Sequence, residues 1–472
     1  MTPNAAPPLN GALASSPPPS GHAVSSPPPA TSDATPRADR ATRADRASRR
    51  RTIVATSVGN GLEMFDFTVF SFFAGIIGKN FFPVGSGSGP LLLAMATFGV
   101  GFVMRPLGGI LIGNYADRAG RRAALSLTIA LMMVGTALIA LTPSYASIGV
   151  IAPVLIVFGR LLQGLSAGGE IGASTTFLME SGPASRRGFM VCWQMVSQGA
   201  AALLGALSGA LLSSLLTPAS LESWGWRVPF ILGLMVGPVG MYIRRNLDET
   251  FEAPEREQSA VGEIVRHYLG RVLLGTLLLV GGTTMLYIIV FFMPAYGVRT
   301  LHLPVATSFL AGCASGAIIM VSSLVSGLWI TDRVARRKPV VIVTSLITLL
   351  CVYPAFKWLT TAPSVPLMIG IVTVVMGIAS LGTGSYFLLI MEAFPRRVRA
   401  TALAMIYSFG VTIFGGFAQF NVTWLLHRTG DAMSPAWYLL ACGVVSQIAL
   451  WCFPERPADA VATATSVAAH KA

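Results

Sequence analysis

Charged residues are scarce in this sequence, and the motifs of metal and nucleophile chemistry are missing. Only 11% of the 472 residues are charged, whereas soluble domains carry about 25%, which excludes a protein surrounded by water. The five cysteines lie in apolar stretches without a C-x-x-C pair, so we expect buried thiols rather than disulfides or metal ligands. No H-E-x-x-H or G-x-S-x-G motif occurs. We therefore expect no cofactor or metal, and a membrane-embedded enzyme is disfavoured.

Long apolar stretches dominate the chain instead. The hydrophobic fraction is 53%, and many stretches approach the roughly 20 residues that cross a bilayer as a helix. In lipid such spans must be helical, because no water satisfies the backbone. The sequence predicts twelve spans, at about 53–78, 90–114, 123–142, 148–173, 188–215, 226–244, 271–296, 305–330, 339–358, 364–390, 400–426 and 434–453.

The basic residues predict the orientation of these spans. The net charge of +13 does not indicate a nucleic-acid partner, because Lys and Arg lie almost entirely in short loops between spans. With both termini in the cytoplasm, the outer side receives only Lys79, Arg227, Arg299, Lys357 and Arg428. This positive-inside pattern predicts a multi-pass protein of the bacterial inner membrane, in contact with its lipid, with both termini cytoplasmic.

Polar segments divide the chain into five predicted regions. The first is rich in Pro, Ser and Arg, with too few apolar residues to offset the entropy of ordering. A polar segment after the sixth span separates two sets of six. The regions are a disordered cytoplasmic tail at 1–50, a six-helix bundle at 51–244, a cytoplasmic central loop at 245–270, a second six-helix bundle at 271–455 and a flexible cytoplasmic tail at 456–472.

The two sets of spans echo each other in their loops. Gly113–Arg122 reads GNYADRAGRR after span two, and Asp332–Lys338 reads DRVARRK after span eight. Likewise MESGP at Met179–Pro183 after span four matches MEAFP at Met391–Pro395 after span ten. Corresponding motifs at corresponding loops indicate a duplicated six-helix unit, which suits alternating access around a midplane site.

Several of these segments resemble a known family. The GNYADRAGRR loop looks like the signature of the major facilitator superfamily. The chain is similar to the metabolite:proton symporter family in GNGLEMFDF at Gly59–Phe67, MRPLGG at Met104–Gly109, GRLLQGLSAGGE at Gly159–Glu170 and WGWRVPF at Trp224–Phe230. Within that family, YGVRT at Tyr296–Thr300 and WLTTAP at Trp358–Pro363 resemble the citrate and tricarballylate carriers.

The resemblance implies a fold and a function. The expected fold is an all-α membrane protein, the major facilitator fold, with twelve transmembrane helices in two six-helix pseudo-repeats. The expected function is proton symport of a small organic acid, citrate or another tricarboxylate or dicarboxylate, by a monomer. The alternatives are proton symport of a zwitterionic osmolyte such as betaine or proline, and a proton-coupled antiporter or exporter. A channel or a transporter-like receptor is disfavoured.

Ionisable side chains inside the spans are the candidate functional groups, because each costs about 2.5–3.5 kcal/mol at the bilayer centre. Glu63 and Asp66 share one helix face through their i, i+3 spacing, and guanidinium groups suit a carboxylate. Alternatively, Asp66 forms a permanent ion pair with Arg105 or Arg160. Spans seven to twelve carry no charge in their middles, so we assign proton handling to the first half.

The predicted roles fall into three groups. We expect a small anion to bind between the halves while an acid takes up a proton, and the inner loops to latch the inward side closed. For Glu170, nearer the cytoplasm, gating or pairing between helices is the alternative. The predicted residues are Arg105, Arg160, Gln163, Gln194, Tyr287 and Tyr386 for substrate, Glu63, Asp66 and Glu170 for proton coupling, and Asp117, Arg118, Arg121, Asp332 and Arg333 for gating.

Overall fold

The computed structural model describes residues 35–85, 89–119, 121–168, 170–245 and 260–455. Contacts divide the chain into two units, Met1–Ser48 and Arg49–Ala472, and the helical bundle belongs to the second. Within the described ranges all regular structure is helical. Asp117, Arg118, Arg121 and Glu170 lie on helices, but their side chains are outside the described part. Also outside it are residues 1–34 of the tail predicted at 1–50, residues 246–259 of the central loop predicted at 245–270, and the tail predicted at 456–472. Residues 35–50, which the sequence assigned to a disordered tail, are helical.

The first half of the bundle runs from α1 to α9. Its elements are α1 (Thr35–Phe81), α2 (Gly89–Ala119), α3 (Arg121–Leu141), α4 (Tyr145–Ile148), α5 (Ile151–Ala167), α6 (Glu170–Glu180), η1 (Ala184–Arg186), α7 (Arg187–Leu215), α8 (Pro218–Ser223), η2 (Gly225–Arg227) and α9 (Val228–Arg245).

The second half runs from α10 to α19. Its elements are α10 (Ala260–His267), α11 (Leu269–Met285), η3 (Leu286–Phe292), α12 (Met293–Arg299), α13 (Val305–Val325), η4 (Ser326–Thr331), α14 (Lys338–Thr361), α15 (Val365–Leu381), α16 (Thr383–Glu392), α17 (Arg396–Gly410), η5 (Val411–Gly415), α18 (Ala418–Thr429) and α19 (Ser434–Cys452).

These helices follow the twelve predicted spans in order. Among the described residues, nine helices are long and apolar enough to cross a membrane, and three shorter apolar helices, Ser126–Leu141, Ile151–Ala167 and Gly225–Met235, occupy the predicted third, fourth and sixth spans. The main difference is local. The predicted span at 148–173 is formed by α5, and the chain then continues into a separate helix, α6.

Three spans of the second half contain a π-helical segment, namely η3, η4 and η5. A π turn closes its hydrogen bonds at i→i+5, is rare, and is frequently found at functional sites. In span seven, η3 separates α11 from α12, and it carries Tyr287. The backbone of this span is therefore widened where the predicted substrate residue lies.

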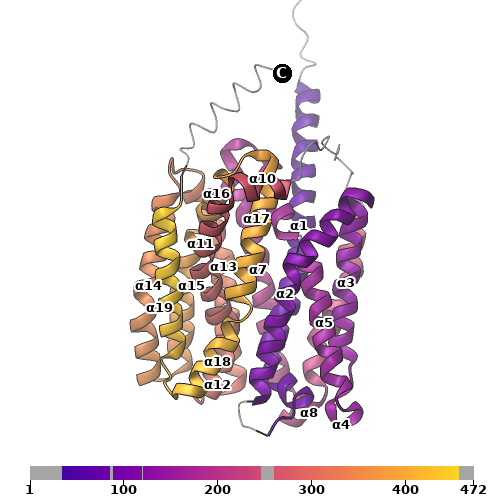
Figure 1. Ribbon diagram of the computed structural model, residues 1–472, viewed down its shortest axis with the longest axis vertical. Coiled ribbons are helices and arrows are strands. Elements are labelled where there is room, and N and C mark those ends of the chain that lie inside the picture. Colours follow the sequence, from indigo (N-terminus) through magenta and orange to yellow (C-terminus); the bar gives the residue numbers. More distant parts are fainter. Residues whose placement is uncertain (1–34, 86–88, 120, 169, 246–259, 456–472) are drawn as a thin grey trace, which may run out of the picture. The chain divides into compact units, whose positions relative to one another are not determined.

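The two halves meet along α7 and α13. In Figure 1, α2, α3 and α5 stand on one side of the bundle, and α14, α15 and α19 stand on the other. Between the halves, a Cβ at Gly199 would lie 2.7 Å from the carbonyl oxygen of Gly316, and one at Gly316 would meet the backbone of Leu203. Only glycine permits backbones this close, and small residues are how membrane helices pack tightly.

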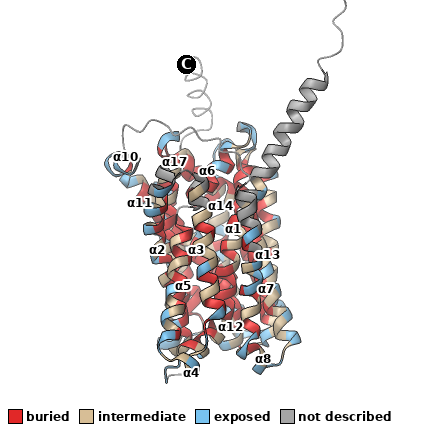
Figure 2. Cartoon of the chain, turned by 90° about the vertical axis from the view of Figure 1, so that its right-hand side faces the viewer, coloured by how far each residue is buried: buried red, intermediate tan, exposed pale blue. Residues whose placement is uncertain are grey.

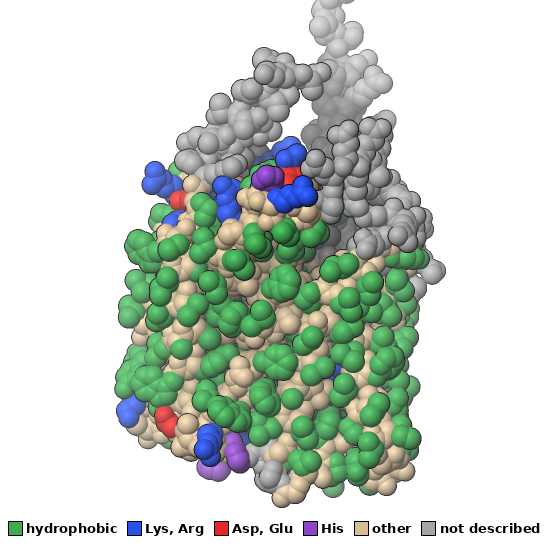
Figure 3. All heavy atoms as spheres, viewed as in Figure 1, with side chains coloured by type: hydrophobic (Ala, Val, Ile, Leu, Met, Phe, Trp, Pro, Cys, Tyr) green, Lys and Arg blue, Asp and Glu red, His purple; other side chains and the backbone are tan. Residues whose placement is uncertain are grey.

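Polar and apolar side chains are separated along the bundle. Figure 3 shows apolar side chains over the flank, with Lys, Arg, Asp, Glu and His gathered at the two ends. Figure 2 shows that buried residues follow the helices through the interior, and that exposed residues gather near α10, α4 and α8. Large apolar side chains such as Leu350, Val321 and Ile448, within α14, α13 and α19, are more than half exposed. Such a surface fits lipid and not water.

Candidate functional site

Glu63 and Arg105 form a buried ion pair between α1 and α2. Arg105 Nη2 donates a hydrogen bond of 2.9 Å to Glu63 Oε1, and Arg105 is only 1% exposed. Two buried charges lose their hydration, so such a pair is tolerated while both partners are present and becomes unstable when one is removed. The structure thus joins a predicted proton-coupling residue to a predicted substrate-binding residue.

Asp66 lies one turn further along α1, and neutral donors hold its carboxylate. Thr136 Oγ1 and Gln163 Nε2 both donate to Asp66 Oδ2, the latter at 3.2 Å. Gln163 Nε2 also donates to Thr136 Oγ1 at 2.9 Å, and Gln163 Oε1 accepts from Arg160 Nη1 at 2.7 Å. Gln163 therefore connects the carboxylate of Asp66 to the guanidinium group of Arg160.

Aromatic rings enclose both guanidinium groups. The ring centroid of Phe67 lies 5.1 Å from Arg105 Cζ and 4.8 Å from Arg160 Cζ. Phe102 is 4.4 Å from Arg105 Cζ, and Phe70 is 3.9 Å from Arg160 Cζ. A desolvated cation over a ring gains on the order of 2 kcal/mol. The rings therefore replace part of the hydration that the two arginines lose.

Tyr287 closes this cluster from the second half of the protein. Its ring lies 5.9 Å from that of Phe98 and 5.4 Å from that of Phe102, edge-on in both cases. Tyr287 is buried, and it belongs to η3 whereas both phenylalanines belong to α2. The arginine–aromatic box is defined here as Arg105, Arg160, Phe67, Phe70, Phe98, Phe102 and Tyr287.

Several donors in the box have no protein acceptor. Within the described residues, Arg105 Nε and Nη1 and Arg160 Nε and Nη2 are buried without a hydrogen-bond partner. An unsatisfied buried donor costs about 1–3 kcal/mol, and more when it is charged. Guanidinium groups bind carboxylates through pairs of parallel N–H bonds. The free donors are therefore suited to an anion that enters the box.

Gln194, also predicted to bind substrate, lies in a separate network between α1 and α7. Its Nε2 donates to Asn60 Oδ1 at 2.8 Å, and Asn60 Nδ2 donates to Ser197 Oγ at 2.6 Å and to the Gln194 carbonyl oxygen at 3.2 Å. All three side chains are buried. The network ties α7, which packs on the second half, to the helix that carries both acids.

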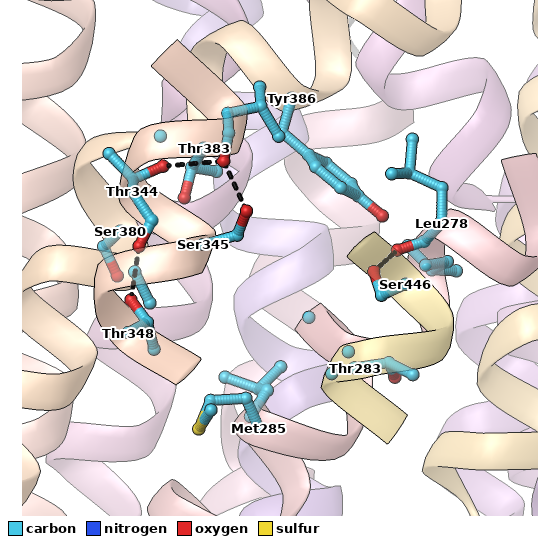
Figure 4. A pocket seen from close by; sticks show the side chains of 18 of the residues that line it. Leu278, Thr283, Met285, Thr344, Ser345, Thr348, Ser380, Thr383, Tyr386 and Ser446 are labelled. Atoms are coloured by element: carbon cyan, nitrogen blue, oxygen red, sulfur yellow. Dashed lines mark hydrogen bonds between the residues drawn. The ribbon is translucent and has the colours of Figure 1, made fainter. Parts of the chain in front are cut away.

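Tyr386 lines a cavity of about 170 Å³ in the second half. Figure 4 shows Tyr386 directed into this space, with the hydroxyl side chains of Thr344, Ser345 and Ser446 on other sides of it. The lining contains no charged side chain. Tyr386 Oη and Thr283 Oγ1 are buried without a hydrogen-bond partner in the described part of the chain. This cavity suits uncharged groups, and it adjoins the box because Thr283 lies one turn before Tyr287 on span seven.

A second cavity, of about 40 Å³, lies in the first half and touches Glu63 and Asp66. Neither cavity includes Arg105 or Arg160 in its lining. In this conformation the free guanidinium donors are thus sealed by the rings around them. An anion would reach them only if the box opened. Because Tyr287 belongs to the second half, separation of the two halves would open the box directly.

Asp332 connects the halves at the α10 end of the bundle. Its Oδ1 accepts from the Gly188 backbone N–H at 2.7 Å, and its Oδ2 accepts from the Phe189 N–H at 2.9 Å. These donors belong to the first turn of α7, so a carboxylate from one half caps a helix of the other. Arg333, the other described residue of the predicted gate, is exposed.

Sequence reasoning missed several residues of this arrangement. Thr136 bonds to Asp66, but hydroxyl residues in apolar spans more often bond to their own helix backbone, so no signal distinguished it. Phe67 follows Asp66 in sequence, yet contact with two arginines depends on tertiary packing. Ser71 Oγ donates to Gln419 Oε1 at 2.7 Å and links α1 to α18. None of these three contacts has a spacing pattern in the sequence.

The sequence of this chain matches a known protein family. Residues 56–418 match the sequence profile of the Major Facilitator Superfamily. The citrate-proton symporter of Klebsiella pneumoniae is 35% identical over 88% of this chain and 94% of its own length. A putative proline/betaine transporter of Staphylococcus aureus (strain COL) is 34% identical over 84% of this chain and 86% of its own length.

Solved structures agree at the level of the fold. A partially occluded, inward-open structure of the xylose transporter XylE from E. coli superposes with a TM-score of 0.70, at 18% identity, over 87% of this chain and 98% of that one. The predicted all-α membrane protein with the major facilitator fold is confirmed. The predicted resemblance to the metabolite:proton symporters is confirmed by the sequence relatives. The family is one of transporters and not of enzymes.

Proposed function

Because the chain belongs to the Major Facilitator Superfamily, we propose that it is a proton symporter for a small organic anion in the bacterial plasma membrane. Citrate or another tricarboxylate is the first substrate, and a dicarboxylate is the second. The relative from Klebsiella pneumoniae, a citrate-proton symporter by name, supports both the coupling ion and the substrate class.

The observation that carries the proposal is the set of free guanidinium donors. Arg105 and Arg160 are almost completely buried, and each has two nitrogen atoms without an acceptor in the described structure. A carboxylate is the ligand whose charge and geometry fit such donors. The hydroxyl group of citrate, or a carboxyl group that enters protonated, has room beside Tyr386 in the cavity of the second half.

The charges of the cluster provide a reason for coupling. The formal charges of Glu63, Asp66, Arg105 and Arg160 sum to zero. Each substrate carboxylate brings one negative charge into this buried cluster, and an uncompensated buried charge is costly. Each proton taken up with the substrate offsets one of these charges. We assign the proton to Asp66, because its partners Thr136 and Gln163 are neutral whereas Glu63 is paired directly with Arg105.

A zwitterionic osmolyte is the second candidate, because relatives with similar identity are named proline/betaine transporters. A quaternary ammonium group is recognised by aromatic faces. In the box, the rings of Phe67, Phe70 and Phe102 already lie against guanidinium groups. The aromatic surface is therefore occupied, which favours the anion.

The remaining roles belong to the same proposal. From the positive-inside pattern we infer that both termini and the α10 end face the cytoplasm, and we propose that the protein acts as a monomer. Asp332 holds the cytoplasmic side closed by capping α7. The other gating residues are Arg333, Asp117, Arg118 and Arg121, while Gln194 contacts substrate and Glu170 assists proton coupling.

Uptake of radiolabelled citrate into proteoliposomes under an inward proton gradient tests the proposal. We expect gradient-dependent uptake that excess unlabelled tricarboxylate blocks and betaine does not. Truncation of a buried charge partner costs about 2–5 kcal/mol, so Arg160→Gln should reduce uptake by at least about 30-fold.

The matched control is Arg227→Gln. Arg227 also lies over an aromatic ring, 4.5 Å from Trp226, but its donors are used by the carbonyl oxygens of Ser223 and Thr142. Its uptake should stay within about threefold of wild type. Uptake of labelled betaine without citrate uptake would overturn the anion assignment while keeping the fold.

A further inference from the structure

The small cavity of the first half is built from three helix faces. It takes i, i+3, i+4 and i+7 positions from α1, a stripe of five residues from α3, and three residues from α9, with one serine from α5. The lining residues are Gly59, Leu62, Glu63, Asp66, Thr128, Ile129, Met132, Met133, Thr136, Ser166, Gly233, Leu234 and Gly237. All belong to the first half, so the cavity is distinct from the interface between the halves.

One carboxylate oxygen of Asp66 faces this cavity. Oδ2 accepts from Thr136 and Gln163 and so faces the network of Arg160. Oδ1 is buried without a hydrogen-bond partner in the described residues. A Cβ at Gly233 would lie 3.0 Å from Oδ1, which places this oxygen against the α9 wall of the cavity. The two oxygens of a single carboxyl group therefore face two different environments.

The cavity has the size and polarity that water requires. Its volume of about 40 Å³ corresponds to roughly three water positions. The polar residues Glu63, Asp66, Thr136 and Ser166 belong to its lining, and Asp66 Oδ1 can accept a hydrogen bond from water there. From Asp66 to Gly59 the lining follows seven residues of α1, a rise of about 10 Å, towards the end of the helix that the proposed orientation places in the cytoplasm.

We propose that this cavity, the proton chamber, holds water and carries the proton from Asp66 towards the cytoplasm along a path separate from that of the substrate. The inference rests on the proposed proton symport. The Asp66 Oδ1–H bond breaks, the proton passes to a chamber water as hydronium, and the carboxylate regains its negative charge. The proton then moves along the water chain, while the substrate leaves between the halves.

Separate paths have a testable consequence. Net uptake requires Asp66 to release its proton in every cycle. Exchange of external for internal substrate does not require this release, because the carrier returns with both substrate and proton bound. A blocked chamber therefore reduces gradient-driven net uptake while exchange continues.

Gly237→Ala is the variant that blocks the chamber. The new Cβ would lie 2.8 Å from Met133 Cγ and Sδ, so the flexible Met133 side chain must move into the space it borders. Gly370→Ala is the matched control, because a Cβ there meets no atom within 4 Å. A second variant, Thr128→Val, keeps the shape of the wall and makes it less polar.

The experiment measures labelled citrate exchange and gradient-driven net citrate uptake with each protein in proteoliposomes. For Gly237→Ala and Thr128→Val we expect exchange within about twofold of wild type and net uptake reduced at least about 10-fold, with Gly370→Ala unchanged in both. If both variants retain net uptake, or lose exchange and net uptake equally, the chamber is not the proton path. Wild type with exchange but no gradient-driven uptake would instead overturn the proposed symport itself.

Discussion

The contact between Asp332 and α7 allows one prediction to be developed quantitatively. The carboxylate accepts two backbone N–H groups of the first turn of α7, at 2.7 and 2.9 Å. Loss of a capping side chain costs typically about 1 kcal/mol, and loss of a negative charge at a helix N-terminus costs about 0.3–1 kcal/mol more. Asp332→Ala should therefore weaken closure of the α10 end by about 1–2 kcal/mol, which is a factor of roughly 5 to 30.

Cys192 provides a native reporter of this closure. It is buried on α7, and a Cβ at Gly327 of η4 would lie 3.2 Å from its sulfur, so the thiol is covered by the same element that precedes Asp332. In a variant whose other four cysteines are replaced by serine, the rate of alkylation by N-ethylmaleimide reports the fraction of open molecules. We expect Asp332→Ala to accelerate alkylation by the same 5- to 30-fold.

Asp431→Ala is the matched control for this measurement. Asp431 Oδ1 accepts a hydrogen bond from the Met433 backbone N–H at 2.8 Å, next to the start of α19. Its capping chemistry is similar, but both residues belong to the second half, so this contact does not connect the halves. Alkylation of Cys192 in that variant should remain within about twofold of the parent protein. Equal alkylation rates in Asp332→Ala and its parent would refute the assignment of Asp332 to closure.

Three further substitutions separate functional from structural roles. Tyr386→Phe removes a hydroxyl group that has no partner in the described structure, so the melting temperature should stay unchanged while the KM for the anion rises about 5- to 10-fold; an unchanged KM would remove Tyr386 from the substrate site. Phe70→Leu removes the ring 3.9 Å from Arg160 Cζ and should destabilise the protein by about 1–2 kcal/mol, visible as a lower melting temperature; an unchanged melting temperature would mean that this ring does not stabilise Arg160. Glu263→Gln breaks a 2.6 Å ion pair with Arg397, whose side chain is 73% exposed; such pairs contribute at most about 1 kcal/mol, so transport should stay within twofold, and a larger loss would assign this pair to the gate.

The sequence predicted the architecture well because membrane folding uses few rules. Apolar length and helix formation in lipid give the spans, and the matching loops at Gly113–Arg122 and Asp332–Lys338 indicate the duplication. The free-energy cost of a charged side chain inside the bilayer identifies charged residues within the spans as candidate functional groups. It selected Glu63, Asp66, Arg105 and Arg160.

Partner choice within the cluster was not predictable in the same way. Helical spacing gives the face on which Asp66 lies, but not the rotation of α3, which brings Thr136 to it, or of α5, which places Gln163 between Asp66 and Arg160. The sequence left a direct Asp66–arginine pair open as an alternative. In the structure Arg105 pairs with Glu63 instead.

The aromatic rings around the arginines and the π-helical segments could not be predicted from the sequence. The chain contains 25 phenylalanines, nearly all in apolar spans, so composition does not distinguish Phe67 or Phe102 from rings that face lipid. The π turn spans Leu286–Phe292, within a predicted span. No local propensity separates it from an ordinary helix.

The most direct test of the central claim is whether citrate uptake is accompanied by proton uptake that depends on Asp66. Citrate is added to unbuffered proteoliposomes without an imposed gradient, and the external pH is recorded for wild type and Asp66→Asn. We expect wild type to alkalinise the medium as citrate enters, and Asp66→Asn to show no such change while still exchanging labelled citrate. Full citrate-driven alkalinisation by Asp66→Asn would contradict the assignment of the proton to this residue.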